Sequence, residues 1–322
     1  MPESVTLASR SDLLCLLPFL DSQLSECCEV FDNKIQLVVF GALRASTSAY
    51  LVYILRETPT DGSYTAIAAI KRENMKKETQ ENQTIWIVSG WSINESALLR
   101  LYSAIDVINW DKDAVFAFNK CYNPHEDILK FFRDRNRIEG HRLYSAGRYV
   151  FDIEKALKLQ ISLPDEVYVK SLERHHAQLI YDHWTVFKDT TTVEDVADEI
   201  DHLPSAGVFL KNNDQLVSWM TGHAANGMSR LFTMDGHRRK GYAKLATQYM
   251  SKRMAQAGYL PFINIVVGNT ASTEFFLGLG FQFVYPMHAI LTKPPGRYSK
   301  RHDIVSRKKC IGLYLIPSRR FS

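Results

Sequence analysis

The stretch from Leu231 to Gly241, LFTMDGHRRKG, constrains the fold of this chain more than any other segment. Its first four residues predict a strand, and a short polar turn follows them. The next residues, YAKLATQYMSKRMAQAGY, have the apolar spacing of an amphipathic helix. A turn that opens a helix leaves several backbone N–H groups without partners, and the helix dipole adds partial positive charge there. The segment therefore predicts a strand–turn–helix unit whose turn suits a pyrophosphate group.

The junction between the turn and the helix reads Arg238-x-x-Gly241-x-Ala243. Glycine at position 241 lets the backbone approach a ligand without a Cβ atom in the way. Arg238, Arg239 and Lys240 add positive charge. By itself this short pattern is as typical of the basic first turn of a surface helix as of a phosphate-binding turn. The segments that follow decide between these two interpretations.

Those later segments come in a characteristic order. Residues Phe262–Val267 form an uninterrupted apolar run that predicts a buried strand, followed by Asn269, a helix over residues 270–279 and the pair Gly280-Phe281. Taken with R-x-x-G-x-A, this order resembles the acyl-CoA-binding half of the GNAT acyltransferase superfamily over residues 167–292. The resemblance implies an α/β fold with the α+β mixed sheet of GNAT proteins.

The length of 322 residues favours two domains. The first half also mixes elements: strand-like runs at 35–40, 49–55, 64–70 and 84–88, and a helical pattern at 95–105. It contains no R-x-x-G-x-A and no other phosphate-cradling glycine loop. We therefore expect a tandem arrangement, with a degenerate GNAT-like domain at residues 1–160 and an acyl-CoA-binding GNAT domain at residues 161–322.

Two helices are predicted early in the second half, over residues 173–187 and 192–203. Thr192 stands where a helix N-cap is expected, and Asp195 follows three residues later. This spacing predicts a reciprocal capping box at the start of the second helix.

The composition, 46% apolar and 23% charged, is that of a soluble globular protein. A net charge of +4 does not argue for nucleic-acid or membrane partners, although it suits a small anionic ligand. The five cysteines include no C-x-x-C pair, so we interpret them as reduced thiols and expect no metal site. No run approaches the roughly 20 apolar residues of a membrane span, and the N-terminus resembles neither a signal nor a transit peptide. We expect a cytoplasmic protein, with mitochondria as the alternative that the family resemblance allows.

The resemblance also implies which residues contact acetyl-CoA or another acyl-CoA. Amides around the turn would bind the pyrophosphate, the preceding strand would pair with the pantetheine arm, and one N–H of that strand would stabilise the oxyanion. Asn269 matches a pantetheine-contacting asparagine of the family, and it is also placed to cap the next helix. The implied cofactor-contacting residues are Leu231, Phe232, Thr233, Met234, Arg238, Arg239, Lys240, Gly241, Tyr242, Ala243, Lys244, Asn269 and Phe276.

The acid that protonates the leaving thiolate is missing from its usual place. In the GNAT family this acid is often a tyrosine four residues before the Gly-Phe pair, and here that position is Phe276. Phenylalanine has no proton to donate. A water molecule, the proton of the substrate amine or Tyr285 would have to replace it, and the sequence does not choose among them.

The sequence also leaves the identity of the general base undecided. Within the superfamily the chain is most similar to the glycine N-acyltransferases, whose proposed catalytic glutamate corresponds to Gly227 here. The matching segments are Leu216–Trp219, Met228–Thr233 with Arg238, His176-Ala177 with Trp184, and Ile108–Trp110.

Three residues near Gly227 are candidates for the missing base. His223 has a side chain whose unperturbed pKa suits a base near neutral pH, although a histidine at this position is more often a solvated hairpin residue. Asp235 is also explained as a turn residue, and His237 as part of the phosphate-binding turn. We take His223 and Asp235 as the catalytic candidates.

Two other patterns have structural interpretations. His175, His176 and His183 lack the H-E-x-x-H spacing, so we interpret them as surface and core histidines rather than metal ligands. The basic segment 293–309 has too little charge and too few aromatic residues to predict nucleic-acid binding. It is either a solvated loop or a contact for the cofactor 3′-phosphate.

The resemblance thus implies an N-acyltransferase that moves an acyl group from acetyl-CoA or a longer acyl-CoA to a small amine acceptor. By resemblance, glycine or another amino acid is the expected acceptor. Two alternatives stay open: an enzyme that acetylates a protein N-terminus or lysine, and a CoA-binding protein that has lost catalysis. An acidic acceptor site would favour the first, and CoA binding without turnover would favour the second.

Overall fold

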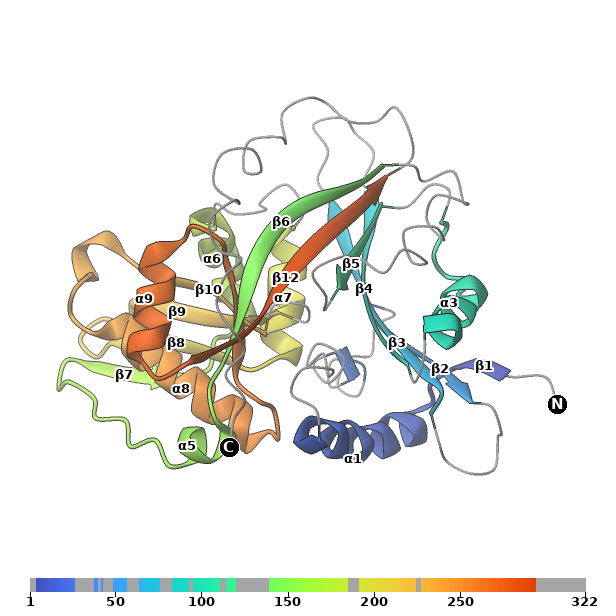
Figure 1. Cartoon of the computed structure of the whole chain (residues 1–322). Coiled ribbons are helices and arrows are strands. Elements are labelled where there is room, and N and C mark those ends of the chain that lie inside the picture. The colour runs from blue at the N-terminus through green and yellow to red at the C-terminus, as the bar shows by residue number, and fades with distance from the viewer. Residues whose placement is uncertain are drawn as a thin grey trace.

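The computed structural model describes residues 4–26, 38–39, 42, 49–56, 64–75, 83–92, 95–110, 114–119, 139–184, 191–223 and 227–293. Within these residues the strands form one twelve-stranded sheet with the order β1-β2-β3-β4-β5-β12-β6-β11-β10-β9-β8-β7. Apart from the two central strands, β12 and β6, the strands of the first half lie at one end of the sheet and those of the second half at the other (Figure 1).

The second half contributes five neighbouring strands to the sheet. They are β7 (Val167–Lys170), β8 (Ser205–Leu210), β9 (Leu216–His223), β10 (Gly227–Thr233) and β11 (Phe262–Val266). The short 3-10 turn η1 (Arg174–His176) and helices α6 (Ala177–His183) and α7 (Val193–His202) pack through a core centred on Trp219 and Phe209. Helices α8 (Tyr242–Gln256) and α9 (Thr270–Gly278) share a separate core with Phe262. The sheet is therefore covered on both faces, as an amphipathic layer structure requires.

The first half repeats this layering. Its strands are β1 (Ser4–Leu7), β2 (Tyr50–Arg56), β3 (Ala66–Met75), β4 (Gln83–Ser92) and β5 (Ala114–Asn119). Helix α3 (Glu95–Ala104) packs through Leu101 and its neighbours, and α1 (Arg10–Glu26) packs through Leu13 and Leu16 in a second core. That second core also contains Leu203, the C-cap residue of α7, so the two halves share a hydrophobic contact.

The last strand of each half lies within the other half. Strand β6 (Glu139–Val150) ends the first half and pairs with β11, from Phe262↔Val150 to Val266↔Ala146. Strand β12 (Gln282–Lys293) ends the second half and pairs with β5, from His288↔Asn119 to Thr292↔Val115. The two strands also pair with each other along nearly their whole length (Figure 1). Separating the halves would therefore break three strand ladders. The short helix α5 (Ile153–Leu157) follows β6 in the chain.

Most predicted elements are confirmed, including the capping box of α7. The side chain of Thr192 accepts a hydrogen bond from the Asp195 N–H at 3.2 Å, and the Asp195 carboxylate accepts one from the Thr192 N–H at 2.8 Å. The stretches 125–135 and 311–316, which the sequence pattern favours as a helix and a strand, lie outside the described residues.

Two predicted elements are wrong. The helix predicted over residues 173–187 ends at His183, and Trp184 has an extended backbone. The side chain of Trp184 instead lies beneath the Arg230 guanidinium, 5.7 Å from the ring centroid, so a tertiary contact accompanies the early end of the helix. Val38 and Val39, predicted in a strand, are helical and buried against α1. A short apolar run cannot distinguish a buried strand from a buried helix.

Candidate functional site

Strands β10 and β11 pair with each other at only one position. Their single register pair is Gly227↔Ile263, whereas the matching strands of the first half, β4 and β5, pair from Ile85↔Ala114 to Val88↔Ala117. Residues 228–233 of β10 therefore have no strand partner on the side that faces β11, and we call this side the open edge of β10. A backbone edge without a partner strand can bind an extended ligand through its N–H and C=O groups. The corresponding edge in the first half is closed.

A glycine permits the one point where these two strands touch. Gly227 has φ +66°, and a Cβ atom at this position would lie 2.4 Å from the carbonyl oxygen of Phe262. Both the backbone conformation and the space exclude larger residues. The base that the family resemblance places at this position therefore has no room here.

A β-bulge bends β10 just after this contact. The register with β9 shifts between Ser229 and Phe232, and Arg230 has φ +50°. A bulge inserts one extra residue and re-aims the side chains around it. Here it directs Arg230 toward helix α7, while Leu231 packs into the core shared with α8. Phe232 returns to the α7 face and stacks on Trp219, with ring centroids 5.1 Å apart.

The turn after β10 is held by contacts that fix Arg238. The short 3-10 turn η3 (Asp235–His237) follows Met234. Arg238 forms an ion pair with Asp235 at 2.7 Å and donates from Nε to the Thr233 carbonyl at 3.2 Å. Its guanidinium also lies 5.6 Å from the centroid of the Phe232 ring. The guanidinium is therefore oriented at the end of the open edge, although its side chain is 57% exposed.

The N-terminus of α8 lacks a side-chain cap. Gly241 is the N-cap residue, with a left-handed backbone at φ +82°, and an ideal Cβ there would meet no atom within 4 Å. The N–H groups of residues 239–244 make no hydrogen bond within the described part of the chain. Arg239 also has a positive φ of 61°, so left-handed residues alternate along this turn. Alternating conformations of this kind make a backbone nest that binds anionic oxygens.

The remaining predicted cofactor residues have mixed environments. Tyr242 is buried, its hydroxyl donates to Glu166 Oε1 at 3.0 Å, and its ring stacks on that of His237 in the turn, with centroids 6.3 Å apart. Burial, and then the Glu166 hydrogen bond, raise the pKa of Tyr242. Asn269 caps α9 by accepting from the Ser272 N–H at 3.1 Å, as the capping interpretation predicts. Phe276 is buried, and its ring packs against Phe281. Ala243 is half-buried, whereas Lys240 and Lys244 are exposed.

The two catalytic candidates differ sharply in their surroundings. Asp235 is exposed and forms its ion pair with Arg238, which agrees with its role as a turn residue. His223 ends β9 and is only 7% exposed, so it is not a solvated hairpin histidine. It pairs directly with Gly227 in the β9–β10 ladder. Its imidazole therefore lies across from the position where the glycine N-acyltransferase resemblance places a glutamate.

Sequence reasoning missed a buried charge cluster beside His223. Glu199 Oε1 accepts from Lys71 Nζ at 2.6 Å, Glu199 Oε2 accepts from Arg230 at 2.5 Å, and His223 Nε2 lies 3.9 Å from Glu199 Oε1. Burial opposes ionisation of Glu199, but the charges of Arg230 and Lys71 outweigh it and lower the pKa of Glu199. One signal was available: Glu199 follows Val196 by three positions, so it lies on the apolar face of α7.

The histidines near η1 and α6 have structural contacts. His176 Nδ1 accepts from the Glu173 N–H at 3.0 Å, and burial lowers the pKa of His176. The His183 ring packs edge-on against Trp219, with centroids 5.5 Å apart. Among the residues that the structure describes, no cluster of three or more His, Cys, Asp or Glu side chains could hold a metal ion.

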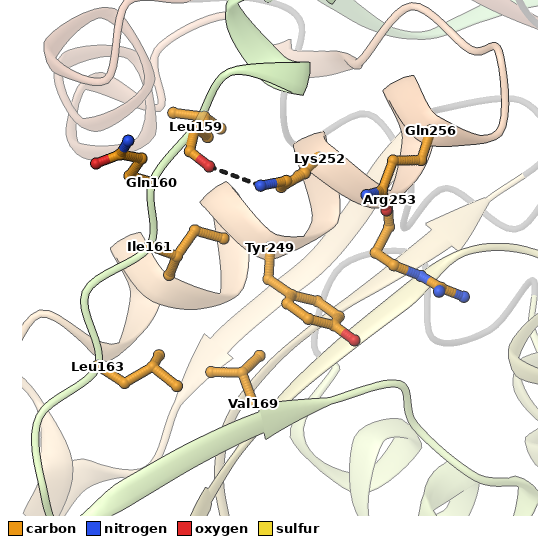
Figure 2. A pocket seen from close by; sticks show the side chains of 9 residues that line it. All are labelled: Leu159, Gln160, Ile161, Leu163, Val169, Tyr249, Lys252, Arg253 and Gln256. Atoms are coloured by element: carbon orange, nitrogen blue, oxygen red, sulfur yellow. Dashed lines mark hydrogen bonds between the residues drawn. The ribbon is translucent and has the colours of Figure 1, made fainter.

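A separate groove lies beside the C-terminal half of α8, away from the turn. It has a volume of about 450 Å³, with apolar walls that include Ile161, Val169 and Tyr249. Figure 2 shows Lys252 at its rim, where Nζ donates to the Leu159 carbonyl at 2.8 Å. This contact attaches the segment that joins the two halves to α8. None of the predicted site residues lines the groove.

Comparisons with known proteins bear on the fold. The FR47-like protein family model matches residues 205–287, which include β8–β11, α8 and α9. A search of curated proteins finds no match. Among solved structures, a Drosophila protein is similar with a TM-score of 0.63 and 16% identity, over 91% of this chain and 99% of that one.

Two further structures share the architecture. A tandem GNAT protein of the clavulanic acid biosynthesis pathway, solved without acetyl-CoA, has a TM-score of 0.53 and 10% identity, over 92% of this chain and all of that one. A putative acetyltransferase from Pyrococcus horikoshii has a TM-score of 0.51 and 10% identity, over 90% of this chain and 88% of that one. The chain therefore has the GNAT fold in a tandem arrangement, and the family-model match supports placement in the GNAT superfamily. No helix in the described ranges is long and apolar enough to cross a membrane.

Proposed function

We propose that this chain is an acyl-CoA-dependent N-acyltransferase whose second half binds the acyl-CoA. One observation carries the proposal: the uncapped N-terminus of α8 lies next to the open edge of β10. Acyl-CoA has a polyanionic pyrophosphate and a long pantetheine arm with amide groups. A backbone nest followed by an unpaired strand edge offers complementary groups to both.

In this proposal the amides of residues 239–244 and the guanidinium of Arg238 bind the pyrophosphate. The open edge of β10, from Leu231 to Thr233, pairs with the pantetheine amides, and one of its N–H groups stabilises the oxyanion. Met234, also predicted to contact the cofactor, already has its N–H bonded to the Val217 carbonyl and its carbonyl bonded to the His237 N–H. Asn269 caps α9 through its side-chain oxygen, which leaves its amide N–H₂ for the pantetheine arm. In the described part of the first half, β4 and β5 pair with each other and leave no open edge between them, so we propose domains 1–160 and 161–322 with acyl-CoA bound only by the second.

We propose His223 as the general base. The acceptor amine attacks the thioester carbonyl carbon, His223 accepts the proton that the amine loses, and the tetrahedral intermediate then breaks its C–S bond to release the CoA thiolate. The position of His223 across from Gly227 supports this role, because the resemblance implies a base at that point of the sheet. Gly227 itself has no side chain and no space for one.

The acceptor in this proposal is a small amine, with glycine or another amino acid first by family resemblance. Acetylation of a protein N-terminus or lysine is the alternative acceptor class. A CoA-binding protein without catalysis is a second candidate, and one observation favours it. The usual acid position holds Phe276, which is buried in the core and has no proton to donate.

Calorimetry with acetyl-CoA, longer acyl-CoAs and desulfo-CoA tests the binding site, and thiol release in the presence of glycine tests turnover. We expect saturable binding of each nucleotide and a ranking that reveals the acyl length. Binding without thiol release from any amine would favour the non-catalytic candidate. If none of the nucleotides binds, the proposed function is wrong.

A further inference from the structure

The two halves meet at a buried cluster of charges. Lys71 comes from β3 of the first half, while Glu199, His223 and Arg230 come from α7, β9 and β10 of the second. Lys71 is 1% exposed and Glu199 is fully buried. The β-bulge at Arg230 is what directs that guanidinium into the cluster rather than toward α8.

The distances place His223 within this cluster. Lys71 Nζ lies 2.6 Å and His223 Nε2 lies 3.9 Å from the same Glu199 oxygen, so the two nitrogens are at most 6.5 Å apart. Arg230 contacts the other oxygen of Glu199 at 2.5 Å and the Thr221 hydroxyl at 3.3 Å. Among the described residues, the imidazole therefore lies beside a carboxylate that two cations also contact.

Stability alone does not account for such a cluster. Desolvating two cations and a carboxylate costs several kcal/mol for each ion. A protein with apolar residues of the same volume at these positions is often as stable or more stable. The cluster adjoins Gly227 and the start of the open edge of β10, where the proposed acceptor amine would lose its proton. A chemical role at that point is consistent with keeping these charges buried.

We propose that Glu199 is a positioning residue for His223, and that Lys71 of the first half sets the charge balance that keeps the imidazole neutral. This inference rests on the proposed function, with His223 as the base. Glu199 stabilises the imidazolium after His223 has accepted the amine proton. Lys71 and Arg230 oppose protonation beforehand, because nearby cations disfavour the charged imidazolium. The first half thus acts in catalysis although it binds no acyl-CoA.

Other titratable groups contribute to this balance. Asp195 lies on α7 one turn before Glu199, faces Lys71, and has its carboxylate engaged with Thr192. Burial raises the pKa of Asp195. The ring of Tyr50, from β2, lies 5.9 Å from Lys71 Nζ. The cluster therefore takes charged or titratable groups from β2, β3, α7, β9 and β10.

The test follows the titration of the His223 imidazole by NMR, with the signal assigned by its loss in His223→Ala. Lys71→Met removes a cation, so we expect the titration midpoint of the His223 imidazole to rise by about one pH unit. Glu199→Gln removes the carboxylate, so we expect a fall of similar size. Lys71→Arg keeps the charge and should restore the wild-type midpoint. Lys158→Met is the matched control, because Lys158 is 77% exposed on the end of α5.

A second readout separates this inference from the proposed function. Acetyl-CoA binding by Lys71→Met should match wild type, whereas the acid limb of its kcat/KM profile with glycine should move with the NMR midpoint. If wild type binds no acyl-CoA, the proposed function fails, while the NMR shifts still report the coupling. If acyl-CoA binds and Lys71→Met leaves the midpoint unchanged, the coupling inference alone is wrong. Because Lys71→Met keeps the Glu199–Arg230 pair, the test does not depend on Glu199→Gln folding.

Discussion

Replacing Arg238 by glutamate tests the proposed pyrophosphate site most directly. The arginine is held by Asp235 and by the Thr233 carbonyl, so its guanidinium needs little reordering when an anion arrives. A hydrogen bond to a charged group contributes about 1.5–3 kcal/mol. Losing it should weaken acyl-CoA binding roughly 10- to 100-fold, since every 1.4 kcal/mol is about tenfold.

Charge reversal adds repulsion to this loss. Two like charges about 4 Å apart in water repel by about 1 kcal/mol, and the exposed position of Arg238 makes the aqueous value appropriate. We therefore expect Arg238→Glu to weaken desulfo-CoA binding by about 100-fold at low salt, and Arg238→Gln by less. Raising the ionic strength should reduce the difference between the two variants, because exposed charges are screened.

The assay is titration calorimetry with desulfo-CoA, which binds without reacting. Arg253→Glu is the control: it makes the same charge change on an exposed residue of α8, in the last turn of the helix. The affinity of the Arg253→Glu protein for desulfo-CoA should stay close to that of wild type. An Arg238→Glu protein that binds desulfo-CoA within twofold of wild type would refute the placement of the pyrophosphate at this turn.

Three further outcomes are expected. Glu199→Gln should lower the free energy of unfolding at pH 7 by about 3–5 kcal/mol in urea titrations, because it leaves buried cations unpaired. Since the pKa of Glu199 is lowered by folding, its contribution is present above the unfolded value of about 4.3 and is lost as pH falls toward the folded value. Equal stability of both proteins at pH 7 would contradict the burial argument. Gly227→Glu should not supply a base: it should lower the thermal midpoint and reduce turnover, and a gain in kcat would overturn this expectation. Phe276→Tyr should cost about 1–3 kcal/mol of stability without raising turnover, because the new hydroxyl would be buried in the core. Higher turnover by this variant would show that position 276 reaches the leaving thiolate.

The sequence predicted the local elements of the second half well. Strong signals lie in short windows there: the apolar run of β11, the Thr192–Asp195 capping box, and the turn before Gly241. Each depends on neighbours in the chain, so residue type and spacing are sufficient. The prediction that the helix over residues 173–187 continues past His183 was wrong: Trp184 is extended and contacts Arg230, a tertiary contact that the local sequence does not indicate.

The charge cluster could not be predicted in the same way. Lys71 and Glu199 are 128 positions apart, and the local sequence around either residue does not predict its contact with the other. Only the packing of α7 between the two halves brings them together. Burial also decided between the two interpretations of His223, because a histidine at the end of a hairpin strand is solvated or buried according to what covers it.

What the sequence by itself determined is the strand–turn–helix unit with its uncapped, basic helix start, and the layered α/β class. These follow from hydrophobic periodicity and from the conformational freedom of Gly241, which are properties of adjacent residues. The tertiary structure alone decided that β6 and β12 exchange places, that β10 and β11 meet only at Gly227, and that Lys71 reaches Glu199. Strand partners and buried ion pairs depend on which distant surfaces the core brings into contact, and local residue order carries little information about that choice.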